Sequence, residues 1–130
     1  MPGAQDEFFK EVEGQMTTGD RGEQIAGQYM EKLGFRIIRF NYRCRYGEID
    51  LVLESREYIV FLEVKLRKND YFATGAEAVN RRKQLKLRRV AEFYLQYNQT
   101  NLNPRFDVLE IYAPDGLKAP MRFNHIENAF

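Results

Sequence analysis

Three ionisable side chains that could carry out chemistry together lie on two neighbouring stretches of the chain. Asp50 belongs to GEIDLV (47–52), and Glu63 and Lys65 belong to FLEVK (61–65). Both stretches alternate apolar and polar residues and are rich in Val, Ile and Phe, which predicts β-strands. Side chains repeat every two residues along a strand, so Glu63 and Lys65 share one face, about 7 Å apart.

The hairpin between these strands determines which carboxylates meet. If its turn is centred on residues 55–56, Glu48 faces Glu63 and Asp50 faces Phe61. Asp50 then lies diagonally beside Glu63, and the three acids converge on one face. A register slip of one residue would carry Asp50 to the opposite face and remove the cluster.

Clustered carboxylates repel one another unless a proton or a cation neutralises them, and Mg²⁺ or Mn²⁺ is the cation that oxygen ligands favour. Asp50, Glu63 and the main-chain carbonyl of Val64 can hold such an ion and leave positions for water and a phosphate oxygen. The metal lowers the pKa of its water and offsets charge on phosphorus. Lys65 can orient that water or stabilise the pentavalent state, and Glu23, on a preceding helix, can take a water-mediated position. The set suits hydrolysis of a phosphodiester.

Other catalytic arrangements are missing from the sequence. There is no GxxxxGK phosphate loop, and the scattered glycines near residue 20 do not fit GxGxxG. His125 is the only histidine, which argues against a Ser-His-Asp arrangement or a histidine-rich zinc site. We expect His125 at the surface or on an edge strand, and Cys44, the only cysteine, to fill a strand position rather than act as a nucleophile.

Composition predicts one globular domain. The chain has 130 residues, of which 44% are hydrophobic and 30% charged. We expect residues 1–17 to form a flexible N-terminal arm and 18–130 to form a single domain. No apolar run reaches the length of a membrane span, and we expect no secretory signal in the first sixteen residues. A single cysteine suits the reducing cytoplasm.

The net charge is only +1, but charge is unevenly distributed along the chain. Residues 1–24 hold six acids and two bases, whereas 65–89 hold nine Lys or Arg and two acids. This segregation indicates an anionic partner at the second segment, with a solvated helix face as the alternative. The residues that we expect to contact nucleic-acid phosphates are Arg43, Arg45, Arg67, Arg81, Arg82, Lys83 and Lys86.

The pattern of periodicity and turns predicts an α/β fold with element order α-β-β-β-α-β-β. In order, the expected elements are a helix from Thr18 or Asp20 to 33, strands at 35–43, 48–53 and 58–67, a helix at 77–97, and strands at 105–113 and 121–126. The residues expected on the core sides of the two helices are Ile25, Ala26, Tyr29 and Leu33, then Val79, Leu87, Val90, Ala91 and Tyr94. A strand, a helix and a further strand after Lys65 imply a crossover to a parallel neighbour, hence a mixed sheet with flanking helices.

Asp50 followed by Glu63-Val64-Lys65 resembles the motif of the PD-(D/E)XK nuclease superfamily. Five segments in order are similar to the YraN family of small bacterial proteins, relatives of archaeal Holliday junction resolvases: GDRGEQIAGQYMEKLGF, NYRCRYGEIDLV, FLEVKLR, GAEAVNRRKQLKLRRVAEFYL and RFDV. The resemblance spans residues 18–113. It implies a restriction-endonuclease-like fold, with Asp50 and Glu63 as metal acids, Lys65 as the catalytic lysine and Glu23 as the helix acid.

Three interpretations of the sequence follow. The first is a Mg²⁺-dependent DNA endonuclease, selective for branched or otherwise structured DNA and acting as a homodimer if both strands are cut symmetrically. The second is a module that binds nucleic acid or a DNA-processing partner on a nuclease scaffold without cutting. The third is an inert ion-pair network in which Lys65 neutralises Glu63, with Arg67 nearby.

Overall fold

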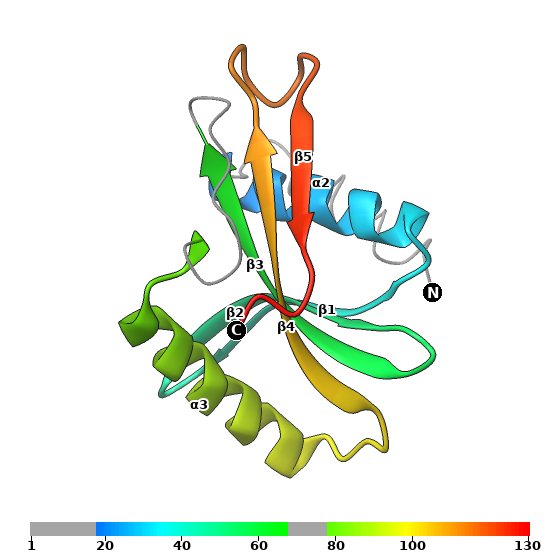
Figure 1. The fold of residues 1–130 in the computed structure, drawn as a ribbon, viewed down its shortest axis with the longest axis vertical. Helices are drawn as coiled ribbons and strands as arrows, with labels where there is room; N and C mark the ends of the chain where they lie inside the picture. The colour runs from blue at the N-terminus through cyan, green and yellow to red at the C-terminus, as the bar shows by residue number, and fades with distance from the viewer. Residues whose placement is uncertain (1–17, 68–77) are drawn as a thin grey trace.

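A computed structural model describes residues 18–67 and 78–130 of the chain (Figure 1). The expected arm at 1–17 and the first residues of the helix expected from 77 lie outside the described residues. Within the described ranges, no helix is long and apolar enough to cross a membrane.

The elements follow the order predicted from the sequence. They are α2 (Thr18–Lys32), β1 (Arg36–Cys44), β2 (Gly47–Glu54), β3 (Tyr58–Arg67), α3 (Arg81–Tyr97), β4 (Asn103–Tyr112) and β5 (Arg122–Ile126). Helix α2 ends before Gly34, whose φ of 99° only glycine adopts without strain. Helix α3 begins at Arg81 because Asn80 caps it: the Asn80 side chain accepts a hydrogen bond of 2.9 Å from the Lys83 N–H.

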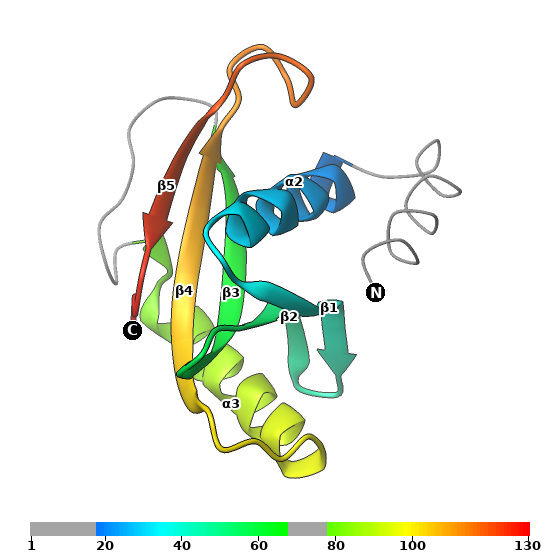
Figure 2. The ribbon, with the colours of Figure 1, turned by 90° about the vertical axis from the view of Figure 1, so that its right-hand side faces the viewer.

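One mixed sheet of five strands forms the centre of the described structure, in the order β1-β2-β3-β4-β5 (Figure 2). Neighbouring strands are antiparallel except β3 and β4, which are parallel and are joined through α3. The predicted crossover is therefore confirmed. The mixed sheet and the element order are compatible with a restriction-endonuclease-like fold.

The two helices bury opposite faces of this sheet (Figures 1 and 2). Helix α2 contributes Ala26 and Met30 to a core with residues from β2, β3 and β4, while α3 contributes Leu87, Val90, Ala91 and Tyr94 to a second core. Leu33 is 51% exposed, so its predicted burial is wrong. Leu33 lies beyond the last helical residue, and the fully buried Met30 fills the position on the stripe instead.

The hairpin between β2 and β3 has a different register from the one predicted. Val52, rather than Asp50, pairs with Phe61. The reason is the turn, which is centred on residues 56–57: the Ser55 N–H bonds to the Tyr58 carbonyl at 2.9 Å, and the Ser55 hydroxyl accepts from the Tyr58 N–H at 3.1 Å. The difference is two residues, so the paired residues 51–54 and 59–62 keep their predicted faces.

A buried carboxylate fixes β4 against β5. Asp107 is completely buried and accepts hydrogen bonds from the Arg105 guanidinium at 2.9 and 2.8 Å and from the Asn128 N–H at 2.9 Å. His125 Nε2 lies 2.8 Å from the same carboxylate and must donate, because an ionised carboxylate only accepts. His125 is on the edge strand, as expected, but its side chain is only 9% exposed.

We predict that Asp107→Asn destabilises the fold by about 3 kcal/mol, because it removes the carboxylate that pairs with the largely buried Arg105 guanidinium. Hydrogen bonds from His125, Arg105 and Asn128 hold the pKa of Asp107 below its ordinary value in spite of burial. Its contribution is therefore present at neutral pH and is lost as the pH falls through that lowered pKa.

Urea unfolding across the acid range measures this effect. The variant should lose less stability than the wild type on acidification. The matched control is Asp115→Asn, in an exposed turn, which should change stability by less than about 0.5 kcal/mol. Equal effects of the two variants would contradict the structural role of Asp107.

Candidate active site

The candidate site forms where β2 separates from β3. The residues of the two strands pair from Glu54 with Ile59 to Leu51 with Leu62. Asp50 is the next residue of β2, and its carboxylate accepts a hydrogen bond of 2.8 Å from the Val64 N–H. A side chain thus takes the place that a main-chain carbonyl of β2 would hold in a continued ladder.

The core packing of β2 explains why Asp50 points between the strands. Leu51 and Leu53 pack in the core under α2, and Val52 packs in the core under α3. Ile49 also packs under α3, although strict alternation would place it with Leu51. The strand therefore rotates at Asp50, which turns this carboxylate toward β3 instead of toward either helix layer.

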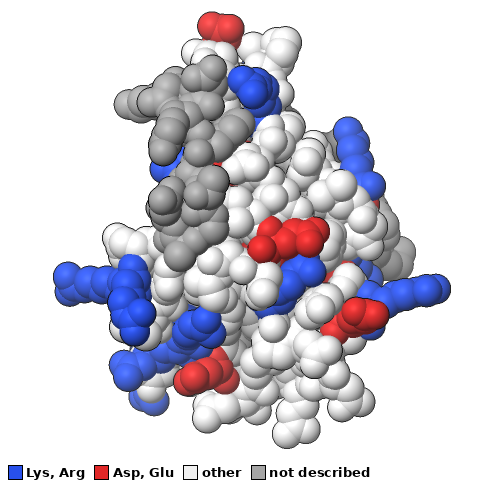
Figure 3. Space-filling model, viewed as in Figure 1, with Lys and Arg blue, Asp and Glu red and all other residues white. Residues whose placement is uncertain are grey.

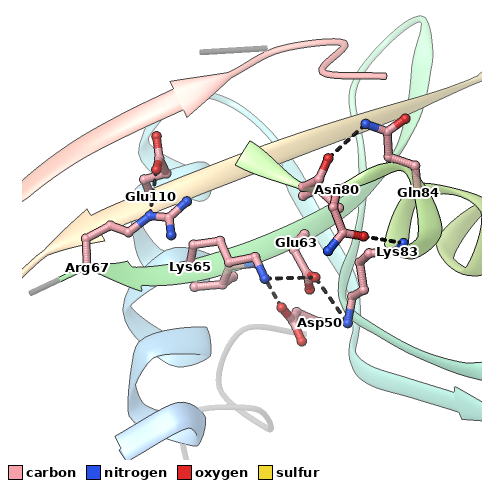
Figure 4. A network of polar contacts seen from close by, with 10 residues as sticks. Asp50, Glu63, Lys65, Arg67, Asn80, Lys83, Gln84 and Glu110 are labelled. Carbon is pink, nitrogen blue, oxygen red and sulfur yellow. Dashed lines mark hydrogen bonds and ion pairs between the residues drawn. The ribbon is translucent and has the colours of Figure 1, made fainter. Parts of the chain in front are cut away.

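Glu63 is the second acid and sits at the same opening (Figure 4). Its side chain is only 7% exposed, and its Oε2 atom has no hydrogen-bond partner. Two ammonium groups lie within ion-pair range of that oxygen, Lys65 Nζ at 3.7 Å and Lys83 Nζ at 3.4 Å. At these distances the ammonium groups offset the charge of Glu63. Both distances are longer than a charge-assisted hydrogen bond, so Oε2 can still accept one.

The acids perturb one another strongly. Burial raises the pKa of Asp50 to about 9, with further contributions from its hydrogen bond and charge repulsion with Glu63 and from the charge of Glu23, opposed by the Val64 N–H. Burial likewise raises the pKa of Glu23 to about 7, and repulsion from Asp20 adds to it. Interaction with the Asp50 side chain partly lowers the pKa of Glu23, so the helix acid and the strand acids influence one another. Without a cation, Asp50 therefore holds a proton at neutral pH.

Two hollows open on either side of this point. One, of about 310 Å³, is lined by Gly19, Asp20, Glu23, Asn41, Arg43, Glu48, Asp50, Val64 and Leu66. The other, of about 520 Å³, is lined by Arg43, Cys44, Gly47, Glu48, Lys83, Lys86 and Leu87. Arg43 and Glu48 line both hollows and bond to each other at 3.0 Å. An acidic hollow thus adjoins a predominantly basic one.

The structure brings together most of the residues predicted for catalysis. Glu23, Asp50 and Val64 line the acidic hollow, Glu63 on β3 interacts with Asp50, and the Lys65 ammonium group lies 3.7 Å from Glu63 Oε2. Within the described ranges, no group of three His, Cys, Asp or Glu side chains could hold a metal ion by itself. A metal here would need the two strand carboxylates, a main-chain carbonyl and exogenous oxygens.

The predicted phosphate-binding residues divide into three groups. Arg43, Lys83 and Lys86 line the basic hollow, and exposed Lys and Arg side chains gather over the part of the molecule where α3 begins (Figure 3). Arg67 instead bonds to the buried Glu110 at 2.7 Å, and Arg45 stacks on the Tyr46 ring. Arg81 and Arg82 are exposed on α3 without lining either hollow.

Sequence reasoning missed two features of this site. It assigned Lys83 to phosphate binding alone, whereas the structure places its ammonium group beside Glu63. It considered Asp20 only as a possible first residue of the helix, whereas Asp20 lines the acidic hollow and raises the pKa of Glu23. The sequence did contain a signal for this contact: Asp20 and Glu23 are three residues apart on one helix, and side chains at this spacing are neighbours.

We predict that metal-free wild-type protein loses stability as the pH rises from about 4 to about 9, since the unfolded Asp50 carboxyl ionises freely there and the folded one does not. Asp50→Asn mimics the protonated acid, because its amide oxygen can accept from Val64 and its amide N–H can donate to Glu63. The variant should be more stable than the wild type by about 2 kcal/mol near pH 8, and the difference should vanish near pH 4.

Thermal or urea unfolding in EDTA checks this expectation. Glu57→Gln, which removes an exposed acid in the hairpin turn, controls for the change of net charge. A sharp loss of stability in Asp50→Asn at pH 8 would favour an inert structural network.

Comparison with known proteins identifies the family of this chain. The uncharacterised protein family UPF0102 matches residues 22–111. A UPF0102 protein of Alkaliphilus oremlandii is 44% identical over 115 residues, covering 86% of this chain and 96% of the relative. UPF0102 proteins of Caldanaerobacter subterraneus and Shewanella denitrificans are 41% and 42% identical and cover 88% and 79% of this chain, and 94% and 93% of their own lengths. The chain therefore belongs to the UPF0102 family, that of the YraN proteins.

Proposed function

We propose that this protein is a metal-dependent DNA endonuclease of the cytoplasm that hydrolyses phosphodiesters, with branched or structured DNA as its preferred substrate. The observation that carries the proposal is the meeting of Asp50 and Glu63 where β2 separates from β3, with Lys65 on the same strand. Hydrolysis of a phosphodiester requires acids that can hold a metal ion, a cation near the phosphate and a surface that binds the neighbouring phosphates. The two acids, the lysine and the basic hollow can meet these requirements.

The residues present fit Mg²⁺ or Mn²⁺. Glu63 has a buried oxygen without a hydrogen-bond partner, and Asp50 carries a proton that a cation could replace. A strand residue directs its N–H and its carbonyl toward the same neighbour, so the Val64 carbonyl also faces the side of Asp50. Asp50, Glu63 and the Val64 carbonyl would hold the ion, which would lower the pKa of a bound water and offset charge on phosphorus.

The surrounding side chains supply the other requirements. Lys65 is one-third exposed, so its ammonium group can leave Glu63 to orient a water or stabilise charge on the phosphate. Glu23, with its pKa of about 7, can accept or release a proton near neutral pH at the edge of the acidic hollow. Arg43 and Lys86 can hold the phosphates that flank the one to be cut.

We predict metal-dependent cleavage by the wild type and at least about a hundredfold loss in both Asp50→Asn and Lys65→Ala. End-labelled single-stranded, duplex, flap and four-way DNA with Mg²⁺, Mn²⁺ or EDTA provide the test. Glu57→Gln, purified identically, should cut like the wild type, which excludes a contaminating nuclease. Cutting that persists in Asp50→Asn would refute this site.

The second candidate function is a module that binds DNA without cutting. It is favoured by the two ammonium groups that already neutralise Glu63 and by the exposed Arg81 and Arg82. Both candidate functions place α3 against the phosphate backbone, so a binding measurement serves both.

We predict that replacing Arg81 and Arg82 together by glutamate weakens binding to all DNA substrates at least tenfold and reduces the slope of affinity against salt by about 2. Fluorescence anisotropy at several salt concentrations in EDTA measures both quantities. The same double substitution to lysine should retain affinity. Unchanged affinity in the glutamate variant would remove α3 from the DNA-binding surface.

A further inference from the structure

The side chain of Lys83 lies between Glu63 and the basic hollow. Its ammonium group lies 3.4 Å from Glu63 Oε2, nearer than that of Lys65, yet its side chain is 40% exposed and lines the basic hollow. Its backbone is fixed, since its N–H donates to the cap residue Asn80 at 2.9 Å. A long flexible side chain on a fixed backbone can therefore reach either Glu63 or a ligand in the basic hollow.

The Glu63 oxygen cannot serve Lys83 and a metal ion equally well. A cation bound to Oε2 would repel an ammonium group a few ångströms away. Glu48, the acid that lines the basic hollow, is already paired with Arg43 at 3.0 Å, so a phosphate in this hollow would offer the displaced ammonium group a new partner. Binding of the cation and binding of the phosphate therefore each remove an obstacle to the other.

We propose that Lys83 is an exchangeable counter-ion: it neutralises Glu63 in the free protein and moves to a phosphate of bound nucleic acid, so that metal ion and nucleic acid bind cooperatively. The inference rests on the proposed function, because it takes the metal site as given, but it requires no cleavage. It gives Lys83 a coupling role in addition to phosphate binding. This role depends on the ion pair of Lys83 with Glu63, so Arg81 and Arg82 on the same helix turn do not have it.

The experiment is a thermodynamic cycle by titration calorimetry. Ca²⁺ is titrated into EDTA-stripped, dialysed protein with and without a short DNA duplex, and intact DNA is verified on a gel. In the wild type we expect DNA to raise Ca²⁺ affinity at least about fivefold. In Lys83→Ala, Ca²⁺ affinity without DNA should rise about threefold, and the effect of DNA should shrink toward none.

Three variants isolate the role. Arg82→Ala removes an equal charge that does not contact Glu63, and Lys86→Ala removes a lysine of the basic hollow that has no ion pair with Glu63. Both should weaken DNA binding but leave the coupling factor at its wild-type value. Lys83→Arg should restore the coupling.

The outcomes separate this inference from the proposed function. Coupling lost only in Lys83→Ala supports the exchange whether or not the protein cuts DNA. Equal coupling in Lys83→Ala and Arg82→Ala would overturn it even if cleavage is observed. If calorimetry detects no Ca²⁺ binding to the wild type, and Asp50→Asn still folds, both the exchange and the metal site are overturned.

Discussion

The hydrogen bond from the Val64 N–H to the Asp50 carboxylate is the interaction on which the site depends. It ends the ladder between β2 and β3 without leaving that N–H unpaired inside the protein, where an unpaired group would be costly. The strands can therefore part while their cores remain packed. Because they part, Glu63 on β3 and Glu23 on α2 both reach Asp50, and an opening forms between two helix layers that otherwise close each face of the sheet.

The sequence predicted the acids because strand periodicity is local information. Glu63 and Lys65 share a face in any straight strand, whatever their partners are. The predicted register was wrong by two residues, since it depended on whether Ser55 lies inside the turn or closes it. The even difference left Asp50 on the side of Glu63, and the acid pair survived the error.

The contacts of the basic residues could not be predicted in the same way. Arg67 bonds to Glu110 because β3 and β4 are parallel neighbours, and their relative register depends on the whole crossover between them. The approach of Lys83 to Glu63 depends on where α3 begins, and Asn80 sets that point four residues later than the helical pattern suggests. Both contacts join segments far apart in the chain, so no local pattern contains them.

The energetics of the acid pair argue against a purely structural role. A half-buried Asp50 with a pKa of about 9 costs the folded protein stability at neutral pH, and Glu63 keeps a buried oxygen without a hydrogen bond. Asp107 shows what a structural carboxylate looks like in this same sheet: every partner donates to it, and its pKa is lowered. The contrast between Asp107 and the pair Asp50 and Glu63 on one sheet supports the proposal that this pair binds a positively charged ligand.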